Sequence, residues 1–394
     1  MNDSEQAEQD AIIKLVGDFA RAEIAPFVST YDAEERMPFE LFPRIGELGL
    51  FGGVISVENG GAGLDFVTYA KVIEEMSKTC QMVATLLSMP SGLVGASIER
   101  YGTDEQRERW LRPLAQGEIF GAAAVTEPGS GSDVAAMTTT YRRDGSDYVL
   151  NGAKAWISNL DIASFFVTFA SCDRTLAHRG ITAFIVPRET PGLGLTPYKN
   201  KLGFRPTSTG EVVLDDVRVP ADAVLGEPGE GFKVAMTAVE RGRLSVAARA
   251  VGVSQACLDD SAAYANERIA FSRLISSFQI VQSKITDMKV GTTTARLLVQ
   301  RCAEALQQGL RARQLTSMAK MYASDVAARS AADAVQIFGA AGVSTDHRVG
   351  RMYRDAKILQ IVEGSNDLHR ALIGEIELGL RSSGESAPKQ GALT

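Results

Sequence analysis

The chain has 394 residues, 45% of them hydrophobic and 23% charged, which is an ordinary globular composition of a length that predicts two or three domains. A net charge of −7 without a long basic block argues against nucleic-acid binding as the main activity. Widely spaced cysteines, isolated histidines and a polar N-terminus predict a cytoplasmic protein without disulfides, a metal site or a signal peptide. No run of about 18 uninterrupted apolar residues is present, so no membrane span is expected.

Residues 1–117 are predicted to form an N-terminal helical domain. Apolar residues recur at helical spacing over 12–20, 41–50 and 67–77. Residues 82–100 are apolar nearly all round, which predicts a buried helix. Asp104 is expected to cap a further helix that carries Trp110 and Leu111.

Residues 118–228 are predicted to form a middle β domain. Apolar or alternating runs predict strands over 120–125, 165–169, 181–186 and 211–219, and such closely spaced strands favour a small antiparallel barrel or sandwich. The dipeptides Asp144-Gly145 and Asn151-Gly152 both predict hairpin turns. These turns would fold the loop after the first strand back towards Trp156.

Residues 229–380 are predicted to form a helical bundle, with long Ala-rich helices near 230–267, 276–309 and 314–340 and shorter ones near 351–361 and 365–379. The Ser/Gly/Pro-rich tail, 381–394, is expected to be disordered. The resulting fold class is α+β, mainly α, because helices, strands and helices follow one another in blocks. Neither a Rossmann glycine motif nor a P-loop is found.

Two stretches of the β domain point to a ligand. In the first, the glycines and small hydroxyls of residues 126–133 could approach phosphate or ring heteroatoms closely. In the second, alternation places Trp156 and Ser158 on one face of a strand, one to stack and one to hydrogen-bond. A Gly/Ser loop is more often only a loop and a strand Trp more often core, and it is their pairing that favours a shared pocket.

A carboxylate near the C-terminus is a candidate base. Glu363 follows the apolar residues of 358–362 and precedes Gly364. A half-buried carboxylate has a raised pKa, which makes it a better base. A capping or surface glutamate is the commoner interpretation of a lone Glu.

Five motifs occur in a fixed order: Thr126-Glu-Pro-Gly-Ser-Gly-Ser-Asp133, Ala155-Trp-Ile-Ser158, Arg268-Ile-Ala-Phe271 with Gln279, Gln336-Ile-Phe-Gly339, and Tyr353-Arg-Asp355 with Glu363-Gly-Ser365. Together they resemble the acyl-CoA dehydrogenase family of FAD enzymes over nearly the whole chain. The resemblance implies an N-terminal helical domain, a middle β domain and a C-terminal four-helix bundle, in agreement with the patterns above.

The resemblance also implies the reaction, α,β-dehydrogenation of an acyl thioester, most simply acyl-CoA to trans-2-enoyl-CoA. Glu363 would remove the α-proton while a hydride passes to flavin N5. Hydrogen bonds to the thioester oxygen, from the base's own N–H and a flavin ribityl hydroxyl, would acidify that proton.

The resemblance assigns further residues to the two ligands. For FAD they are Val125, Thr126, Ser132, Trp156, Ile157, Ser158, Arg268, Phe271, Gln279, Gln336, Phe338, Gly339, Ala340, Ser365 and Asp367. For the thioester substrate they are Ser132, Glu240, Arg243 and Gly364. Glu240 and Arg243 lie one helical turn apart and could equally pair with each other, and Arg268 is also compatible with a structural ion pair.

The sequence departs from the family pattern in informative ways. Some members carry the base immediately before the matched Arg243, where this chain has Gly242, so Glu363 is the only placed base. Val362 replaces a frequent Tyr, and Ala270 replaces a frequent hydroxyl. The helix over 82–100 is expected to line the acyl cavity, with candidates Leu87, Ser88, Met89 and Ser91. No cation lies between Lys78 and Arg100, which disfavours an acyl group with a second carboxylate, such as glutaryl.

Partners follow from the same resemblance. An electron-transfer flavoprotein is the expected electron acceptor, and a homotetramer or homodimer is expected because neighbouring subunits share the family's FAD site. Two alternatives keep the chemistry: a thioester on an acyl or aminoacyl carrier protein, and an oxidase that uses oxygen. A non-catalytic flavin- or acyl-binding protein is the remaining alternative, and the presence of Glu363 argues against it.

Overall fold

A computed structural model describes residues 3–310 and 312–382. The N-terminal region is helical, as predicted. Its helices are α1 (Asp3–Phe19), α2 (Val28–Glu34), α3 (Phe42–Glu47), α4 (Phe66–Ser77), α5 (Gln81–Met89), α6 (Gly95–Tyr101), α7 (Asp104–Gln106) and α8 (Arg112–Gln116). The predicted helix over 82–100 is α5 and α6 joined by a π-helical turn, Pro90–Val94, and it is buried.

The predicted cap at Asp104 is wrong. Thr103 is the N-cap of α7, and its side chain accepts a hydrogen bond from the Gln106 backbone N–H at 3.2 Å. The Gln106 side chain in turn accepts one from the Thr103 N–H at 3.1 Å. This reciprocal capping box satisfies two free backbone donors, which Asp104 in the first turn cannot do.

The middle region is an eight-stranded sheet in the order β6-β7-β3-β2-β4-β5-β8, with β1 beside β4. Its strands are β1 (Phe120–Ala124), β2 (Thr140–Asp144), β3 (Asp147–Ser158), β4 (Ala163–Ser171), β5 (Ile181–Pro187), β6 (Leu193–Pro197), β7 (Thr209–Val219) and β8 (Val224–Leu225). The pairs are antiparallel as predicted, except that β1–β4 and a single bridge between β2 and β4 are parallel.

One predicted hairpin turn is right and the other is wrong. The Asp144-Gly145 turn joins β2 to β3, with Asp144 opposite Asp147. Asn151-Gly152 lies inside β3, where a bulge against β7 takes up the glycine at φ 150°. The Asn151 amide donates to Asp216 Oδ1 at 2.9 Å across that pair, so a neighbouring strand uses the polar group that a turn would have used.

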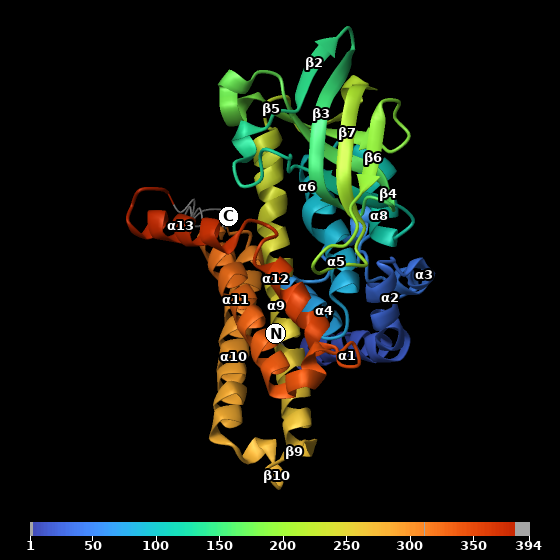
Figure 1. The fold of residues 1–394 in the computed structure, drawn as a ribbon. Helices are drawn as coiled ribbons and strands as arrows, with labels where there is room; N and C mark the ends of the chain where they lie inside the picture. The colour runs from blue at the N-terminus through green and yellow to red at the C-terminus, as the bar shows by residue number, and fades with distance from the viewer. Residues whose placement is uncertain (1–2, 311, 383–394) are drawn as a thin grey trace.

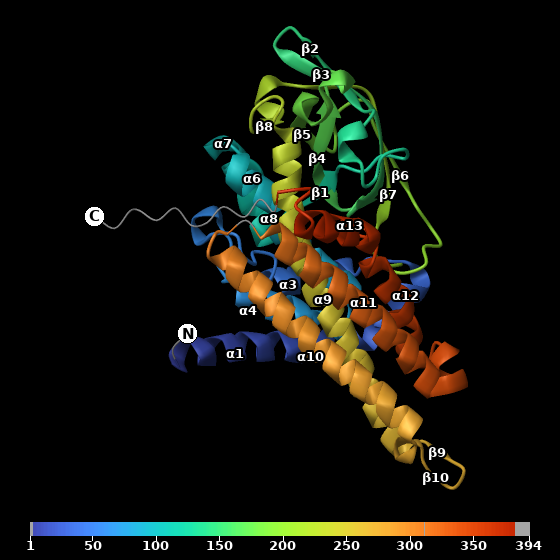
Figure 2. The same ribbon diagram turned by 90° about the vertical axis from the view of Figure 1, so that its left-hand side faces the viewer.

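The C-terminal region is helical. It contains α9 (Gly231–Glu267), a small hairpin of β9 (Ile269–Ala270) and β10 (Arg273–Leu274), then α10 (Gln279–Gln307), α11 (Arg313–Phe338), α12 (Val349–Leu359) and α13 (Asn366–Glu377). Helix α9 packs on α4, α10 and α11, so its middle part is buried almost all round. The β domain lies at one end of the bundle and the β9–β10 hairpin at the other (Figures 1 and 2).

One helix of the described residues, Gln81–Tyr101, is long and apolar enough to cross a membrane. However, 94% of its most apolar window is buried inside the protein, as in a core helix. The predicted disordered tail falls mainly on residues 383–394, which lie outside the described part of the chain.

Candidate active site

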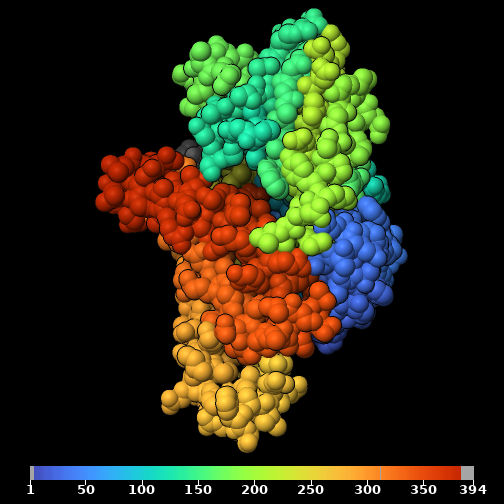
Figure 3. All heavy atoms as spheres, viewed as in Figure 1, coloured from blue at the N-terminus to red at the C-terminus, as the bar shows by residue number. Residues whose placement is uncertain are grey.

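Glu363 lies on the turn that joins α12 to α13, and in Figure 3 this red segment adjoins the β domain. Its φ is 56°, an unusual conformation for a residue with a side chain, and Gly364 follows at φ 92°. Three side chains fix the two carbonyls of this turn. Arg243 Nε and His369 Nε2 donate to Glu363 O at 3.4 and 3.2 Å. Lys320 Nζ donates to Gly364 O at 2.7 Å.

The Glu363 carboxylate lies against α9 at Gly242. A Cβ built on Gly242 would come within 2.9 Å of both Cδ and Oε2 of Glu363. The missing side chain therefore makes the space that the carboxylate occupies. Glu363 approaches α9 at the position where, by resemblance, other family members carry their base.

Burial and nearby cations act on the pKa of this carboxyl in opposite directions. Burial raises the pKa of Glu363 to about 7, although the side chain stays reachable from solvent. Three cations oppose that shift, namely Arg243, Arg249 and Lys320. A carboxyl with a pKa near neutrality can accept a proton in one step and release it in another.

His369 and Lys320 stabilise the Glu363 turn through its backbone carbonyls. Burial lowers the pKa of His369 to about 3, so its imidazole is neutral. A carbonyl oxygen only accepts, so the proton of that imidazole lies on Nε2, and the buried Nδ1 has no partner among the described residues. Burial also lowers the pKa of Lys320 to about 7, and its second hydrogen bond goes to Asn366 Oδ1 at 2.9 Å.

The sequence patterns did not reveal Arg249, Lys320, His369 and Asn366. The signal that could have found two of them was a charged residue inside an otherwise small and apolar run of a buried helix, as at Arg249 and Lys320. His369 and Asn366 carried no such signal.

On the β domain, Trp156 presents an open ring. It is 63% exposed, has φ 61° and lies at an irregularity of β3 between Lys154 and Ile157. Thr126 and Ser158 are half-buried beside it, and the Ala155 N–H donates to Thr126 O at 2.9 Å. The structure therefore joins the first predicted loop to the Trp156 strand. Ile157 instead points into the core and is 2% exposed.

A buried ion pair that the sequence did not predict holds this arrangement together. Glu127 and Lys154 form a 2.8 Å pair, with side chains 1% and 0% exposed. Glu127 also accepts hydrogen bonds from the N–H groups of Thr138 and Thr139 at 2.5 and 2.9 Å. Burial raises the pKa of Glu127, but Lys154 and these donors outweigh that effect and lower it to about 2. Burial lowers the pKa of Lys154 to about 8, so both groups are charged at pH 7.

The other residues assigned near the Glu363 turn differ in exposure. Ser132 and Asp367 are exposed, and Glu240 is half-buried. The hydroxyl of Ser365 caps α13 by accepting from the Leu368 N–H at 3.2 Å. Arg243 is 7% exposed, and besides Glu363 O it donates to Ser317 Oγ at 3.3 Å.

The remaining predicted cofactor residues gather at the opposite end of the molecule, around the β9–β10 hairpin and the end of α11 (Figure 1). They are Arg268, Phe271, Gln279, Gln336, Phe338, Gly339 and Ala340. Phe271 is 90% exposed, whereas Phe338 stacks on Tyr264 with ring centroids 4.1 Å apart. A single chain does not bring these residues to Trp156 or Glu363.

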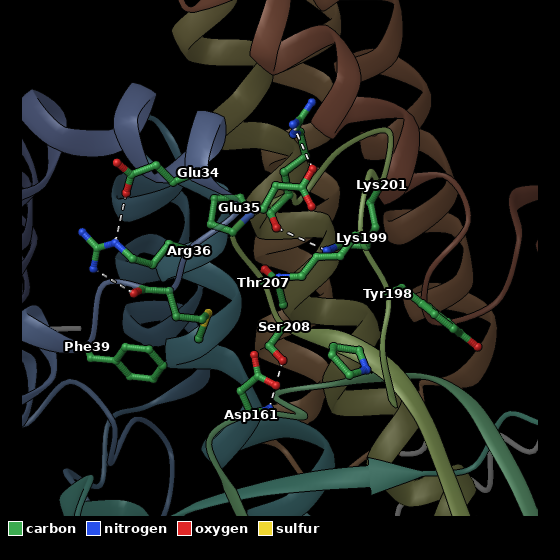
Figure 4. Close-up of a pocket in the computed structure, with 14 residues that line it drawn as sticks. Glu34, Glu35, Arg36, Phe39, Asp161, Tyr198, Lys199, Lys201, Thr207 and Ser208 are labelled. Atoms are coloured by element: carbon green, nitrogen blue, oxygen red, sulfur yellow. Dashed lines mark hydrogen bonds and ion pairs between the residues drawn. The ribbon is translucent and has the colours of Figure 1, made fainter. Parts of the chain in front are cut away.

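A surface hollow of about 270 Å³ lies elsewhere, between the N-terminal region and the β domain (Figure 4). In it, Glu35 and Arg36 face Lys199, Lys201 and Thr207 across the opening. None of its lining residues belongs to the Glu363 turn. No group of three or more potential metal ligands occurs within residues 3–310 and 312–382.

Comparison with known proteins agrees with this geometry. Models of the N-terminal, middle and C-terminal domains of acyl-CoA dehydrogenases match residues 6–118, 122–217 and 229–378. The chain belongs to the acyl-CoA dehydrogenase family. It is 40% identical to the human mitochondrial short-chain specific acyl-CoA dehydrogenase over 362 residues, covering 92% of this chain and 88% of the relative.

Two solved structures are similar over almost their full length. Butyryl-CoA dehydrogenase from Megasphaera elsdenii has a TM-score of 0.91 and 37% identity, covering 94% of this chain and 98% of that one. A glutaryl-coenzyme A dehydrogenase in complex with glutaryl-CoA has a TM-score of 0.94 and 35% identity, covering 98% of each chain. This acyl-CoA dehydrogenase is thus an FAD-dependent oxidoreductase that acts on the CH–CH group of an acyl-CoA.

The residues present fit a flavin ring. An exposed indole flanked by two half-buried hydroxyls offers one apolar contact and two hydrogen-bonding groups. The ion pair beneath the loop keeps these groups in place without occupying the open face.

Proposed function

We propose that this enzyme oxidises a short acyl-CoA at the Cα–Cβ bond, with Glu363 as the base that removes the α-proton. The proposal depends most on the Glu363 carboxylate, which lies in the space left by Gly242 with a pKa raised to about 7. A carboxylate of ordinary pKa would be a weaker base for a carbon acid. The short-chain preference of the human relative supports the acyl length.

FAD supplies the hydride acceptor when it is bound. Thr126 and Ser158 would hydrogen-bond its ring, and Trp156 would pack against it. The backbone of Val125 and Ile157 would lie alongside. Ser132, Ser365 and Asp367 would contact the cofactor from the loop and from α13.

On the substrate side, the Glu363 backbone N–H would donate to the thioester oxygen, which stabilises the negative charge that develops there. Gly364 leaves room for the thioester next to the turn. Arg243 holds the turn through Glu363 O, and Glu240 would contact the CoA portion from the same helix.

The distal residues would hold the adenosine half of FAD bound to a neighbouring subunit. Arg268 is exposed and has no ion-pair partner among the described residues, so it can meet a pyrophosphate. Ile269, Phe271 and Ile280 expose large apolar surfaces at the same end of the molecule, which favours burial against another copy. We therefore propose a homotetramer or homodimer.

We further propose an electron-transfer flavoprotein as the acceptor, a cytoplasmic location, and domain boundaries near 117/118 and 228/229. An acyl-carrier-protein substrate and an oxygen-using oxidase stay alternatives, although the relatives named above act on CoA esters.

The test is anaerobic titration of the purified yellow protein with a panel of acyl-CoA esters while the flavin spectrum is recorded. Bleaching by at least one short ester is expected. The Glu363→Gln variant should lose this bleaching by about 10³-fold in rate or more while still binding FAD. Glu118→Gln is the matched control, because Glu118 is exposed and lies just before β1. A protein that cannot be loaded with FAD, or a Glu363→Gln variant that bleaches normally, would overturn the proposal.

A further inference from the structure

A buried arginine without a counter-ion lies near the catalytic carboxylate. Arg249 of α9 is 4% exposed, and no carboxylate of the described residues lies within ion-pair distance of it. One of its N–H groups donates to Thr85 Oγ1 on α5, and its Nε has no partner among the described residues. An isolated buried cation is unfavourable unless something compensates its charge.

A second buried polar atom beside Arg249 also lacks a partner within the described residues. It is Oε1 of Gln81, a residue that is only 5% exposed. Gln81 is adjacent, because its amide donates to Arg249 O at 3.3 Å and its backbone carbonyl accepts from the Thr85 hydroxyl at 2.8 Å. Two unsatisfied groups side by side, Arg249 Nε and Gln81 Oε1, indicate a place for a polar ligand rather than one isolated defect.

The position of Arg249 relative to Glu363 is set by α9. Gly242 contacts the Glu363 carboxylate, and Arg249 follows seven residues later on the same helix face, about 10 Å further along the axis. The fields of Glu363 and Arg249 act on each other, each favouring the charged form of the other group. A substrate whose α-carbon lies at Glu363 can extend the far end of a short acyl chain along this face.

Phe204 forms an apolar boundary beside the guanidinium. Arg249 Cζ lies 5.5 Å from the centre of the Phe204 ring. The Phe204 backbone is held by α12, since its N–H donates to Asp355 Oδ1 at 2.7 Å. The Arg249 side chain therefore lies between Thr85 of α5 and the ring of Phe204.

We propose that Arg249 binds a carboxylate at the far end of the acyl group, so that the substrate is a CoA monoester of a short dicarboxylic acid. The inference rests on the proposed function, because it takes Glu363 as the point where the α-carbon lies. A guanidinium fork matches a carboxylate in two parallel hydrogen bonds, and the incoming charge supplies the missing counter-ion.

This proposal reverses one prediction from the sequence. The absence of a cation between Lys78 and Arg100 disfavoured a second carboxylate, but the cation that faces α5 comes from α9. The prediction considered only the residues of the helix over 82–100, whereas the charge is carried by α9.

Binding is measured first in the Glu363→Gln background, where turnover is blocked. The probes are succinyl-, glutaryl- and adipyl-CoA, with pentanoyl- and hexanoyl-CoA as uncharged esters of similar length, and dissociation constants come from calorimetry. At least one dicarboxylic ester should bind on the order of tenfold tighter than its uncharged counterpart. Arg249→Met should weaken that ester by about 30-fold or more. It should tighten hexanoyl-CoA, because an apolar side chain of similar length replaces the charge.

Arg249→Lys keeps the charge but not the two parallel donors of a guanidinium. Its affinity for the dicarboxylic ester should lie between those of the Arg249 and Arg249→Met proteins. Equal effects of Arg249→Met on charged and uncharged esters would overturn the proposal and assign Arg249 to Glu363 instead. Tighter binding of the uncharged esters by the protein that retains Arg249 would also overturn the proposal. This result can be obtained even if Arg249→Met does not fold. If an ester binds with this pattern but never bleaches the flavin of the native enzyme, the proposed function fails while the carboxylate site stands.

Discussion

Two glutamates in this molecule, Glu127, which is buried, and Glu363, which is half-buried, have opposite electrostatic characters. Glu127 makes a 2.8 Å pair with Lys154 and accepts two backbone hydrogen bonds, and its pKa is lowered to about 2. Glu363 has cations nearby but no ion pair within 4 Å among the described residues, and its pKa is raised to about 7. Burial raises the pKa of both carboxyls, so it does not explain the difference between them.

The direct ion pair with Lys154, together with hydrogen bonds to the carboxylate oxygens, accounts for the low pKa of Glu127, and among the described residues Glu363 has neither. At Glu127 every donor points at the carboxylate oxygens, which stabilises the charged form. At Glu363 the donors of Arg243 and His369 point at the backbone carbonyl instead, and leave the carboxylate free to take a proton. The first arrangement suits a structural charge and the second suits a base.

Glu127→Gln should give the largest loss of stability. It removes the counter-charge of a fully buried lysine, which typically destabilises a protein by about 3–5 kcal/mol. We expect a lower midpoint of chemical unfolding, followed by far-UV circular dichroism, and weaker retention of FAD, because the Thr126 loop loses its anchor.

The double variant Glu127→Gln/Lys154→Met is the control for that experiment. It removes both charges, so it should recover much of the lost stability. If Glu127→Gln unfolds at the same denaturant concentration as the native protein, the Glu127–Lys154 pair contributes nothing to stability. Glu127 would then not be the structural charge that sets it apart from Glu363.

Gly242→Ala should be the next largest effect, and it acts on catalysis. The added Cβ would lie 2.9 Å from Glu363 Cδ, so the carboxylate must move by a few tenths of an ångström or more. A misplacement on this scale in a catalytic group lowers the rate by up to about 100-fold. The rate of flavin bleaching by a short acyl-CoA measures it.

Gly374→Ala in α13 is the matched glycine control, because a Cβ at this position would meet nothing within 4 Å. It should bleach at the native rate and gain up to about 1 kcal/mol of helix stability. Equal rates for the two alanine variants would show that the carboxylate does not depend on the space at Gly242.

Much of the fold followed from local patterns in the sequence. The three long helices of the bundle and the strands around 165–169 and 181–186 are where periodicity placed them. The wrong predictions concern positions where two local structures were both compatible with the residues. Asn151-Gly152 has the composition of a turn, but pairing with β7 absorbs it into a strand, and Thr103 takes the capping position from its neighbour Asp104. Such outcomes depend on partners far away or on a reciprocal side-chain bond.

The site was predictable only in part. The Glu363 turn and the Thr126–Trp156 pairing carry recognisable residues, and the structure joins Thr126 to the Trp156 strand through Ala155. The groups that set the pKa of Glu363 could not be assigned, because Arg249 and Lys320 reach it from two different helices. Charge at a site depends on tertiary packing that spacing along one helix does not reveal.

The pH dependence separates the two glutamates by sign. Glu363 must be ionised to accept a proton, so kcat/KM for flavin reduction should rise with pH up to about 7, by about tenfold per pH unit well below that value. Glu363→Gln should abolish this limb together with the activity, whereas Glu118→Gln should leave it in place. The profile is measured by stopped-flow bleaching in buffers of constant ionic strength.

Stability responds in opposite directions because the two pKa shifts are opposite. The folded pKa of Glu363 lies above its usual 4.5, so its contribution is fully present below pH 4.5 and is lost as the pH rises through about 7. The folded pKa of Glu127 lies below 4.5, so its contribution is present above that pH and is lost as the pH falls towards about 2. Relative to the native protein, Glu363→Gln should therefore raise the unfolding midpoint more at pH 8 than at pH 5. Glu127→Gln should lower the midpoint at both pH values. If the two variants shifted the midpoint in the same direction at pH 8, the two carboxyls would not differ in the way that their hydrogen bonds require.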